Sequence, residues 1–243
     1  DNATALVFRV LDPPTPADRD ELREFAASQA VRIYLQPGSP ESVVPLDPEA
    51  VWDDLHYRLP VFDLTLTFGP TDFIQVHGEV NRLMVDQALG LLAPAPTDRV
   101  LDLYCGIGNF TLPLARTAGE VTGLEGAAGA VRRGRHNAAL ASLANARFVE
   151  ADLAGAGVEG AWIRERFDLV VCYDVLQYLD EEQARKAIAR LSRVCRGALY
   201  FGVLTREDWD NNCDQSRPDP AVSLRGGAWY RRELKKSFRH LGA

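Results

Sequence analysis

The stretch VLDLYCGIGNFTLPLA, residues Val100–Ala115, decides the fold of this 243-residue chain. An apolar run ends in a turn bracketed by Gly106 and Gly108, and the chain then passes directly into residues that favour a helix. Glycines in such a turn adopt backbone conformations that other residues avoid, and they let a ligand approach the main chain closely. Glycine turns between strand and helix also arise from plain chain geometry, so this stretch alone leaves ligand binding open.

Strand-like and helix-like segments alternate from this stretch onward. The strand candidates are RVLDLYC, EVTGLE, ARFVEA, FDLVVCY and GALYFGVL. Helical periodicity lies between them, including Ala127–Ala144 and Asp180–Val194. Strands that alternate with helices of this length are typical of βαβ units around a parallel sheet. The sequence therefore predicts an α/β fold with a mostly parallel, doubly wound sheet.

The front of the chain predicts a small separate α/β subdomain. Strand patterns cover Ala5–Leu11 and Val31–Pro37, and the segment ADRDELREFAASQ between them has the apolar spacing of an amphipathic helix. A further helix is expected over Glu79–Leu92. We therefore expect a subdomain over residues 1–75 and a larger domain over residues 76–243.

One acid lies at or just after the end of each of the first three strand candidates of the larger domain. Asp102 lies near the end of the first, where it could reach an amine or ammonium, and Glu125 ends the second, where an acid accepts hydrogen bonds from ribose hydroxyls. Asp152 follows the third, where an acid could receive an adenine amino group. This arrangement suits an adenosine with a cationic amino-acid tail. A dinucleotide fits less well, because the third glycine is missing and an acid beside the turn would repel a pyrophosphate.

This combination resembles the class I S-adenosylmethionine-dependent methyltransferases. More specifically, DFIQV (Asp72–Val76), VLDLYCGIGNFTLPLA, GLEG (Gly123–Gly126) and NARFVEADL (Asn145–Leu153) resemble the RNA uracil-C5 methyltransferases of the 23S rRNA branch. The resemblance covers about residues 1–153. It implies a Rossmann-like methyltransferase fold, S-adenosyl-L-methionine as cofactor, RNA as a partner and a part in rRNA processing.

The resemblance also implies a set of residues that bind the methyl donor. It makes Gln75, Tyr104, Asn109 and Glu125 donor contacts and puts Asp152 where the family has Asn or Asp. Together with the residues inferred above, the expected cofactor site consists of Gln75, Asp102, Tyr104, Gly106, Gly108, Asn109, Glu125 and Asp152. Other interpretations remain open, with Tyr104 as a packing residue, Gln75 as a loop amide and Asp152 as a helix cap.

The residues that should activate the acceptor are not evident. The family adds a cysteine thiolate to C6 of uracil and then uses a carboxylate base to remove the C5 proton. It carries these groups in a DPPR-like turn, an SCNP-like turn and a terminal His-Val-Glu-like segment, and none of the three occurs in these 243 residues. Asp174 falls about one residue out of step with the first, and Cys195 precedes the fifth strand candidate instead of following it. The catalytic residues are therefore unknown, with Asp174 and Cys195 as candidates.

The second half of the chain resembles generic class I methyltransferases of small molecules. In these, a segment such as YDVLQYLDEE (Tyr173–Glu182) follows the fourth strand and helps to wall the acceptor site. The sequence thus indicates a hybrid, or chimera, with a joint between Leu153 and Phe167, whether natural or engineered. After Thr205 we expect a Trp-containing loop and then a helix over Trp229–Leu241. Aromatic and basic residues gather in this tail, namely Trp209, Arg225, Trp229, Tyr230, Arg231 and Arg232. They could form a rim that holds an acceptor or, alternatively, a face exposed to solvent.

Three functional hypotheses follow. The first is S-adenosylmethionine-dependent methylation of uracil C5 in ribosomal RNA, and the second keeps the donor but replaces RNA with a small-molecule acceptor. The third is a catalytically inactive or engineered scaffold that binds the donor. A net charge of −7 and a pI near 5.2 argue against binding nucleic acid by bulk charge, but they allow a local basic patch.

Composition also bears on metals and compartment. The four cysteines form no CxxC pair, which disfavours a zinc site and suits a reducing compartment, so no metal is expected. No apolar run approaches the roughly 20 residues that span a bilayer, and the first residues lack a signal-peptide pattern. We therefore expect a cytoplasmic protein with no membrane partner, while its oligomeric state stays open.

Overall fold

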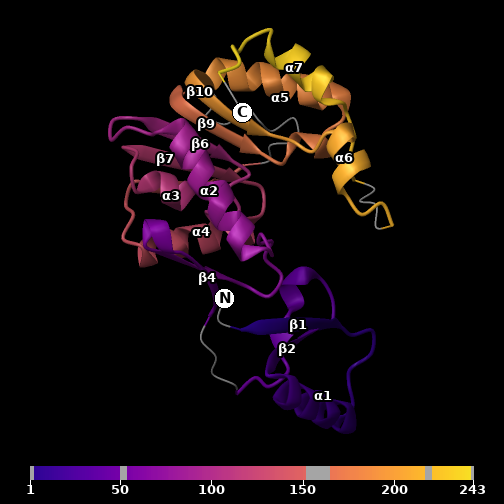
Figure 1. Cartoon of the computed structure of the whole chain (residues 1–243). Helices are drawn as coiled ribbons and strands as arrows, with labels where there is room; N and C mark the ends of the chain where they lie inside the picture. Colours follow the sequence, from indigo (N-terminus) through magenta and orange to yellow (C-terminus); the bar gives the residue numbers. More distant parts are fainter. Residues whose placement is uncertain (1–2, 50–53, 152–164, 217–220, 242–243) are drawn as a thin grey trace. The chain divides into compact units, whose positions relative to one another are not determined.

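The computed structural model of the chain describes residues 3–49, 54–151, 165–216 and 221–241 (Figure 1). The chain divides into two compact units, Asp1–Met84 and Val85–Ala243, which we call the N-terminal and C-terminal units. The boundary falls within helix α2 (Gly78–Leu92). The N-terminal unit holds two small sheets, and the C-terminal unit holds one sheet of five strands.

The N-terminal unit begins with a parallel strand–helix–strand arrangement. Its elements are β1 (Thr4–Arg9), α1 (Pro16–Gln29), β2 (Val31–Gln36), the 3-10 helix η1 (Pro40–Ser42), β3 (Val44–Pro45), β4 (Leu55–Leu59), the 3-10 helix η2 (Pro60–Phe62) and β5 (Leu64–Phe68). Strands β1 and β2 are parallel, β3 is antiparallel to β2, and β4 and β5 form a separate antiparallel pair. The predicted strand–helix–strand order at the front of the chain is confirmed.

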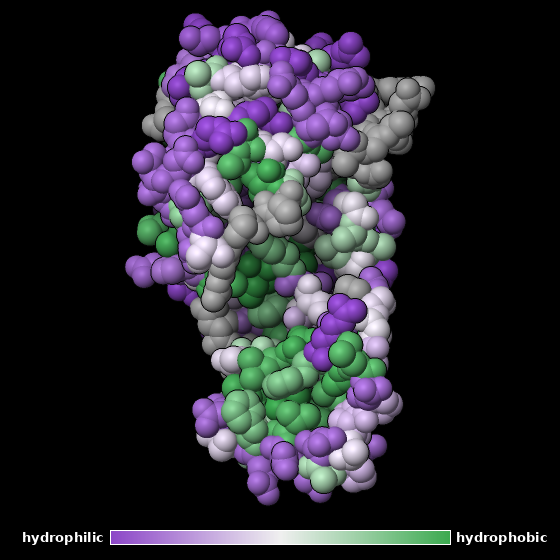
Figure 2. All heavy atoms as spheres, turned by 90° about the vertical axis from the view of Figure 1, so that its right-hand side faces the viewer, coloured by the Kyte–Doolittle hydropathy of each residue, from purple (hydrophilic) through white to green (hydrophobic). Residues whose placement is uncertain are grey.

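Helix α1 shows how local sequence sets an element in this unit. Thr15 accepts a hydrogen bond from the Asp18 N–H, and the Asp18 side chain accepts one from the Thr15 N–H, so the helix starts with a capping box. No residue of α1 is buried, and Leu22 and Ala26 of this helix pack against a small buried cluster of Ile33, Leu35 and Leu46. Figure 2 shows hydrophobic residues gathered on the face of this unit that it displays. Leu55, Leu59, Leu64 and Leu66 of the β4–β5 pair are buried as well, whereas Phe25 and Val44 are exposed to solvent.

The C-terminal unit contains a five-stranded, fully parallel sheet. Its elements after α2 are β6 (Arg99–Leu103), α3 (Thr111–Ala115), β7 (Glu120–Glu125), α4 (Ala128–Leu140), β8 (Ala146–Glu150), β9 (Phe167–Tyr173), the 3-10 helix η4 (Leu176–Tyr178), α5 (Glu181–Val194), β10 (Cys195–Gly202), α6 (Arg206–Asn212) and α7 (Gly227–Leu234). The strand order is β10-β9-β6-β7-β8. The chain moves outward from β6 to β8 and then returns to β9 on the other side of β6. The predicted doubly wound parallel sheet is confirmed, and its switch point lies between β6 and β9.

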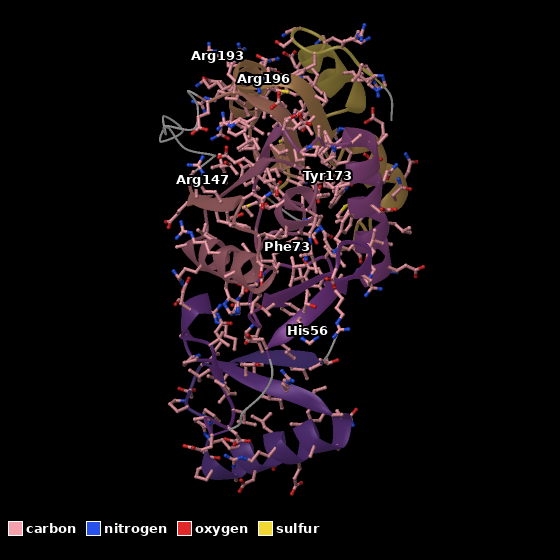
Figure 3. All side chains as sticks on the ribbon, turned by 90° about the vertical axis from the view of Figure 1, so that its left-hand side faces the viewer. His56, Phe73, Arg147, Tyr173, Arg193 and Arg196 are labelled. Carbon is pink, nitrogen blue, oxygen red and sulfur yellow. The ribbon has the colours of Figure 1, made fainter. Side chains whose placement is uncertain are left out.

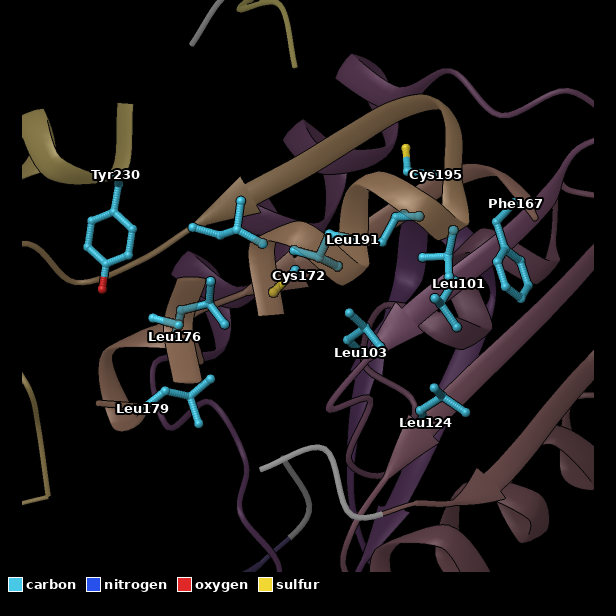
Figure 4. Packing of buried hydrophobic residues seen from close by; sticks show 14 residues of the cluster. Leu101, Leu103, Leu124, Phe167, Cys172, Leu176, Leu179, Leu191, Cys195 and Tyr230 are labelled. Atoms are coloured by element: carbon cyan, nitrogen blue, oxygen red, sulfur yellow. The ribbon is translucent and has the colours of Figure 1, made fainter. Parts of the chain in front are cut away.

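One face of this sheet packs against α5 and α7 (Figure 4). Leu101, Leu103 and Leu124 from neighbouring strands join Cys172 and the apolar side of α5 in one buried cluster. Helix α5 begins with a capping box between Asp180 and Gln183, and then buries residues at helical spacing, namely Ala184, Ile188, Leu191 and Val194. This packing fixes the strands, so the loops at their ends start from a rigid base.

Three expectations about the second half were wrong. The loop expected after Thr205 is helix α6, which starts with a capping box between Thr205 and Asp208. The last helix runs over Gly227–Leu234 and does not reach Leu241. Cys195 is the first residue of β10 and does not precede it. No helix in the described ranges is both long enough and apolar enough to cross a membrane.

Candidate functional site

The glycine turn lies at the carboxyl edge of the five-stranded sheet, the edge at which its parallel strands end. Three residues of the turn have positive φ, Tyr104 at 57°, Gly106 at 54° and Gly108 at 104°. Tyr104 is the exception among them, because a left-handed backbone conformation is costly for a residue with a bulky side chain. Backbone strain of this kind persists only where the surrounding structure holds it, and it is concentrated at functional sites.

The two glycines of the turn serve different purposes. A Cβ atom at Gly106 would meet nothing within 4 Å, so the space beside this residue is open. A Cβ atom at Gly108 would lie 2.9 Å from the Leu112 side chain and 3.0 Å from the Phe148 ring. Gly106 therefore leaves room for a ligand against the main chain, whereas Gly108 lets the turn pack onto the unit behind it.

Glu125, the last residue of β7, is bonded directly to the turn. Its Oε2 accepts a hydrogen bond from the Gly106 N–H at 3.1 Å, and its Oε1 accepts one from the Ala127 N–H at 2.8 Å. The carboxylate is therefore oriented by two backbone donors beside the open space at Gly106. Each oxygen keeps a further lone pair with which it can accept a hydrogen bond from a ligand hydroxyl.

Asp102 lies one strand away, buried beneath the turn with an exposed fraction of 2%. Its Oδ2 accepts a hydrogen bond from Thr111 Oγ1 at 2.6 Å. Burial raises the pKa of Asp102 to about 7, although the bond from Thr111 opposes the shift. The Asp102 carboxyl is therefore poised between its charged and neutral forms near neutral pH, and a cation brought next to it would favour the charged form.

Two residues far along the chain hold the turn in shape. Asn137, fully buried on α4, donates a hydrogen bond from Nδ2 to the Ile107 carbonyl at 3.2 Å. Gly123 on β7 lies under the turn, and a Cβ atom there would come within 2.7 Å of Cys105 Sγ and 2.9 Å of Thr111 Oγ1. The sequence carried no signal for Asn137, and it marked Gly123 only as part of the GLEG motif, without indicating that this glycine packs under the turn.

Six of the eight predicted cofactor residues lie in this part of the C-terminal unit. They are Asp102, Tyr104, Gly106, Gly108, Asn109 and Glu125, which come from the ends of β6 and β7 and from the turn after β6. Gln75 belongs to the N-terminal unit, where it lines a pocket of about 280 Å³ that also includes Tyr57 and Arg82. Asp152 lies outside the described residues, as does most of the expected joint between Leu153 and Phe167. The structure brings six of the residues together, and the cofactor-binding roles of all eight stay predictions.

The two catalytic candidates lie at opposite edges of the sheet. Asp174 directly follows β9 at the carboxyl edge, is exposed, and has a φ of 58°. Cys195 opens β10 opposite Phe167, at the edge where the parallel strands begin. Burial raises the pKa of the Cys195 thiol. Asp174 is thus near the glycine turn, whereas Cys195 is separated from it by the length of the sheet.

Two of the other three cysteines are also poorly suited to act as nucleophiles. Cys105 and Cys172 are buried, and burial raises the pKa of both thiols, that of Cys172 to about 12. A thiol is reactive as the thiolate, so a raised pKa in an apolar setting makes it inert. Cys213, at the end of α6, is half-buried and is the most accessible of the four.

Two of the six residues of the predicted aromatic and basic rim, Arg225 and Tyr230, are buried, whereas Arg231 and Arg232 are exposed. Arg225 is only 9% exposed and Tyr230 only 2% exposed. The Arg225 guanidinium donates to the Tyr230 hydroxyl and lies 5.2 Å from the ring centres of both Trp229 and Tyr230. Arg225 and Tyr230 are therefore packing and hydrogen-bonding groups, while a role for the exposed Arg231 and Arg232 at an acceptor stays a prediction. Within the described ranges, no cluster of three or more His, Cys, Asp or Glu residues could hold a metal ion.

Comparison with known proteins identifies the kind of domain. A family model described as a methyltransferase domain matches residues 100–197, which include the turn, the strands β7, β8 and β9 in full, and parts of β6 and β10. The chain is 47% identical over 195 residues to the 23S rRNA (uracil(1939)-C(5))-methyltransferase RlmD of Xanthomonas campestris pv. campestris, a match that covers 77% of the chain and 44% of the relative. It is 50% identical over 171 residues to the RlmD of Alkalilimnicola ehrlichii, covering 70% of the chain and 38% of that relative.

The extent of these matches has two consequences. The chain spans less than half the length of these curated relatives. A match over 77% of 243 residues, wherever it begins, includes the region of the expected joint. Relatedness to the 23S rRNA enzymes is therefore not confined to the part of the chain before residue 153.

Solved structures agree on the fold. The Pyrococcus abyssi tRNA (uracil-54, C5)-methyltransferase, solved with S-adenosyl-L-homocysteine, matches with a TM-score of 0.56 at 20% identity, over 81% of this chain and 45% of that one. Magnesium protoporphyrin IX methyltransferase from Synechocystis, solved with bound SAM, matches with a TM-score of 0.50 at 22% identity, over 70% and 74% of the chains. The chain is therefore a homologue of the 23S rRNA uracil-C5 methyltransferases, and its C-terminal unit has the class I methyltransferase fold.

Proposed function

We propose that the chain is an S-adenosylmethionine-dependent methyltransferase, with the donor bound at the carboxyl edge of its five-stranded sheet. The proposal rests on one observation: Glu125 accepts a hydrogen bond from the Gly106 N–H, and the space beside Gly106 is open. Both carboxylate oxygens of Glu125 are held by backbone N–H groups, and a Cβ atom at Gly106 would meet nothing within 4 Å. An adenosine ribose needs this combination of a fixed acceptor and a bare main chain.

The residues present fit the rest of the donor. Among the described residues, the buried Asp102 carboxyl is hydrogen-bonded to the uncharged Thr111 and has no ion pair, so the ammonium of an amino-acid tail would supply the missing positive charge. When bound, the donor would supply a methyl group on a sulfonium, and an acceptor would form a bond to the methyl carbon while the opposite carbon–sulfur bond breaks and the neutral thioether leaves. The protein positions the two reactants and excludes water, and positioning of this kind supplies much of the rate of such a transfer.

For the acceptor, we propose uracil C5 in ribosomal RNA. The support is the 47% identity to the Xanthomonas relative over 195 residues. This chemistry requires a thiolate that adds to C6, and Cys213 is the thiol most accessible to a substrate. A carboxylate base is also required, and Asp174 is the exposed carboxylate that directly follows β9.

A second candidate is an acceptor that needs no thiolate, such as a small molecule. The observation that favours it is the burial of Cys105, Cys172 and Cys195, with the pKa of each thiol raised. Methylation of an oxygen, nitrogen or already reactive carbon requires only a base and correct placement. In that case Cys213 is a surface residue without a role in the reaction.

One experiment separates these functions. The chain is incubated with methyl-labelled donor and a 23S rRNA fragment, and in parallel with the same fragment carrying 5-fluorouracil, which traps a covalent cysteine adduct because it has no C5 proton to release. For uracil methylation we expect label in the RNA and a trapped adduct that disappears in Cys213→Ser. Cys172→Ser is the matched control, because its thiol is buried.

Other outcomes identify the alternatives. Label that enters a small acceptor, with no adduct on RNA, supports the second candidate and rejects uracil C5. Donor binding by calorimetry without transfer to any acceptor supports the donor-binding scaffold. If neither S-adenosylmethionine nor S-adenosylhomocysteine binds, the methyltransferase proposal itself is wrong.

A further inference from the structure

Helix α4 is basic and contains no acidic residue. Its sequence is AGAVRRGRHNAAL, and its basic residues are Arg132, Arg133, Arg135 and His136. Helix α5 is built differently, because Arg185 and Lys186 form ion pairs with glutamates four residues before them. In a chain with a net charge of −7, α4 is therefore a local concentration of positive charge.

The packing of α4 decides which of its sides meets solvent. Val131 and Ala138 are buried, and Gly134 lies so close to β8 that a Cβ atom there would overlap the Phe148 ring. The side of α4 toward the sheet is therefore filled and cannot turn outward. The basic residues lie on the other side of the helix, where Arg132, Arg135 and His136 are exposed and Arg133 is half-buried.

Two arginines of α4 keep a charge that no carboxylate cancels. Arg132 and Arg135 form no ion pair with another described residue, in contrast to Arg99 and Arg196 at the edge where the strands begin. The Arg135 guanidinium donates to the Phe148 carbonyl from Nε at 3.2 Å and from Nη2 at 2.8 Å. Because a carbonyl is uncharged, these bonds fix the guanidinium without neutralising it, and its other N–H groups can bind an anion.

Arg116 extends the basic surface past the end of α4. It is exposed after α3 and donates from Nη1 to the carbonyl of Ala141, the C-cap of α4, at 3.5 Å. At its other end, α4 begins three residues after Glu125, so the surface starts at the carboxyl edge and runs for about 20 Å toward the amino edge. We call the residues Arg116, Arg132, Arg133, Arg135 and His136 the α4 face.

The composition of the α4 face indicates which partner it fits. A helix that lies in a membrane surface buries its apolar side in lipid, but the apolar side of α4 is already packed against β8. The core of a protein interface is apolar, whereas the exposed residues of α4 are basic or small, apart from Leu140. A polyanion needs only spaced cations, and guanidinium groups match phosphate geometry.

We infer that the α4 face binds the sugar-phosphate backbone of an RNA whose target base lies at the carboxyl edge. The inference rests on the proposed function with RNA as acceptor, because α4 begins at the edge where that function puts the donor. Phosphate contacts position a nucleic acid without reading its sequence, so the α4 face adds affinity and orientation whichever nucleotide is methylated. A small acceptor at that edge is too short to reach along α4, so only a polymer uses the face.

The salt dependence of RNA binding tests the inference. Fluorescence anisotropy measures the affinity of the whole chain for a labelled 23S rRNA fragment from about 50 to 200 mM KCl. In the double variant Arg116→Ala with Arg132→Ala, the slope of log affinity against log salt should fall by about 1.4–1.8, since each lost phosphate contact removes about 0.7–0.9. This corresponds to roughly 20- to 60-fold weaker binding near 0.1 M salt. Arg135 is left unchanged because it also holds β8.

Two further double variants are the controls. Lys186→Ala with Lys235→Ala removes the same charge from exposed positions on α5 and after α7, which pack on the other face of the sheet from α4. This variant should keep the wild-type slope. Arg116→Lys with Arg132→Lys retains both charges and should keep it as well. Calorimetry with S-adenosylhomocysteine reports on the donor site separately and should give the same affinity in every variant.

Three results would overturn the inference. The first is a wild-type slope in the alanine variant of the α4 face, or an equal loss of slope in the Lys186 and Lys235 control. The second is no binding of the RNA fragment by the wild-type chain, in which case binding of S-adenosylhomocysteine still supports the donor site. The third is a loss of affinity for polyglutamate but not for RNA in the alanine variant, because the face then takes an acidic protein.

Discussion

The two edges of the five-stranded sheet differ in how completely their polar groups are paired. At the amino edge, where the strands begin, Arg99 pairs with Glu120 and Glu165, and Arg196 holds Asp168 through two hydrogen bonds. Figure 3 shows Arg147, Arg193 and Arg196 away from Tyr173 on the C-terminal unit. This edge is a network of satisfied ion pairs between strands that are far apart in the sequence.

At the carboxyl edge, where the strands end, several groups are strained or incompletely paired. Tyr104 and Asp174 have positive φ, Asp102 is a buried carboxyl with a raised pKa, and Gln177 Oε1 has no partner among the described residues. Each of these features costs stability, and a fold keeps such features where a ligand makes use of them. The amino edge thus carries paired charges that stabilise the fold, while the carboxyl edge carries the strained and incompletely paired groups on which the proposed donor site rests.

The largest expected effect is on donor binding, and two glutamates of one strand test it at the two edges of the sheet. Glu120 is the first residue of β7 and lies at the amino edge, whereas Glu125 is the last residue of β7 and lies at the carboxyl edge. Glu125→Ala should weaken S-adenosylhomocysteine binding by about 1.5–3 kcal/mol, the range for a lost hydrogen bond to a charged group. Glu120→Ala should leave binding unchanged. Isothermal calorimetry measures both, and equal losses in the two variants would contradict the assignment of the donor site.

A smaller effect concerns pH and Asp102. Its pKa is raised to about 7, and a bound ammonium requires the ionised form, so donor binding must expel a proton at lower pH. Affinity should therefore rise with pH from 5.5 to 7, by at most about tenfold per pH unit. The measurement stops at pH 7 because the donor's own amine begins to lose its proton above that pH, with a pKa of about 7.7–8.0 for a free α-amino group.

The control for this prediction is Asp102→Asn. With no carboxyl to titrate, the dependence of affinity on pH should be much flatter. Thr111→Val removes the hydrogen bond that opposes the shift and should move the midpoint of the wild-type profile to higher pH. A wild-type profile that is flat over the whole range would show that Asp102 does not pair with the donor.

The smallest effect is expected at the amino edge. Arg196 and the Arg99 N–H lower the pKa of Asp168 to about 2, so the ion pair stabilises the fold above the ordinary pKa of 3.8 and is lost as the pH falls through about 2. Because Arg196 is about half exposed, Arg196→Ala should cost only about 0.2–1 kcal/mol at pH 7. Urea unfolding at pH 7 and pH 3 checks this, with the difference between wild type and variant shrinking at pH 3. Donor affinity should not change, and a clear loss would refute the separation of the two edges.

Much of this arrangement could be predicted from the sequence. The alternation of strands and helices predicted the doubly wound sheet, and the positions of Asp102 and Glu125 at strand ends followed from it. These features depend on local periodicity and on the rule that parallel strands share a carboxyl edge. The sequence also contained a signal for the helix after Thr205, because Thr205 and Asp208 have the spacing of a capping box. A loop was expected there instead because of the Trp and Asn residues around it.

Other features depend on contacts between distant residues. The burial of Arg225 could not be predicted, because arginine is rarely buried and its acceptors at Leu176 and Leu179 are more than 40 residues away. The different uses of Gly106 and Gly108 also escape the sequence, since both are glycines in one turn and only the packing of Leu112 tells them apart.

The close contact beneath the glycine turn has an evolutionary consequence. Gly123 faces Cys105 and Thr111 so tightly that a methyl group at position 123 would overlap both. No single substitution relieves the overlap, and shrinking Thr111 would remove the hydroxyl that holds Asp102. Positions 102, 105, 111 and 123 are therefore epistatic, so a lineage that keeps the donor site is expected to inherit them together even while the loop after β9 diverges.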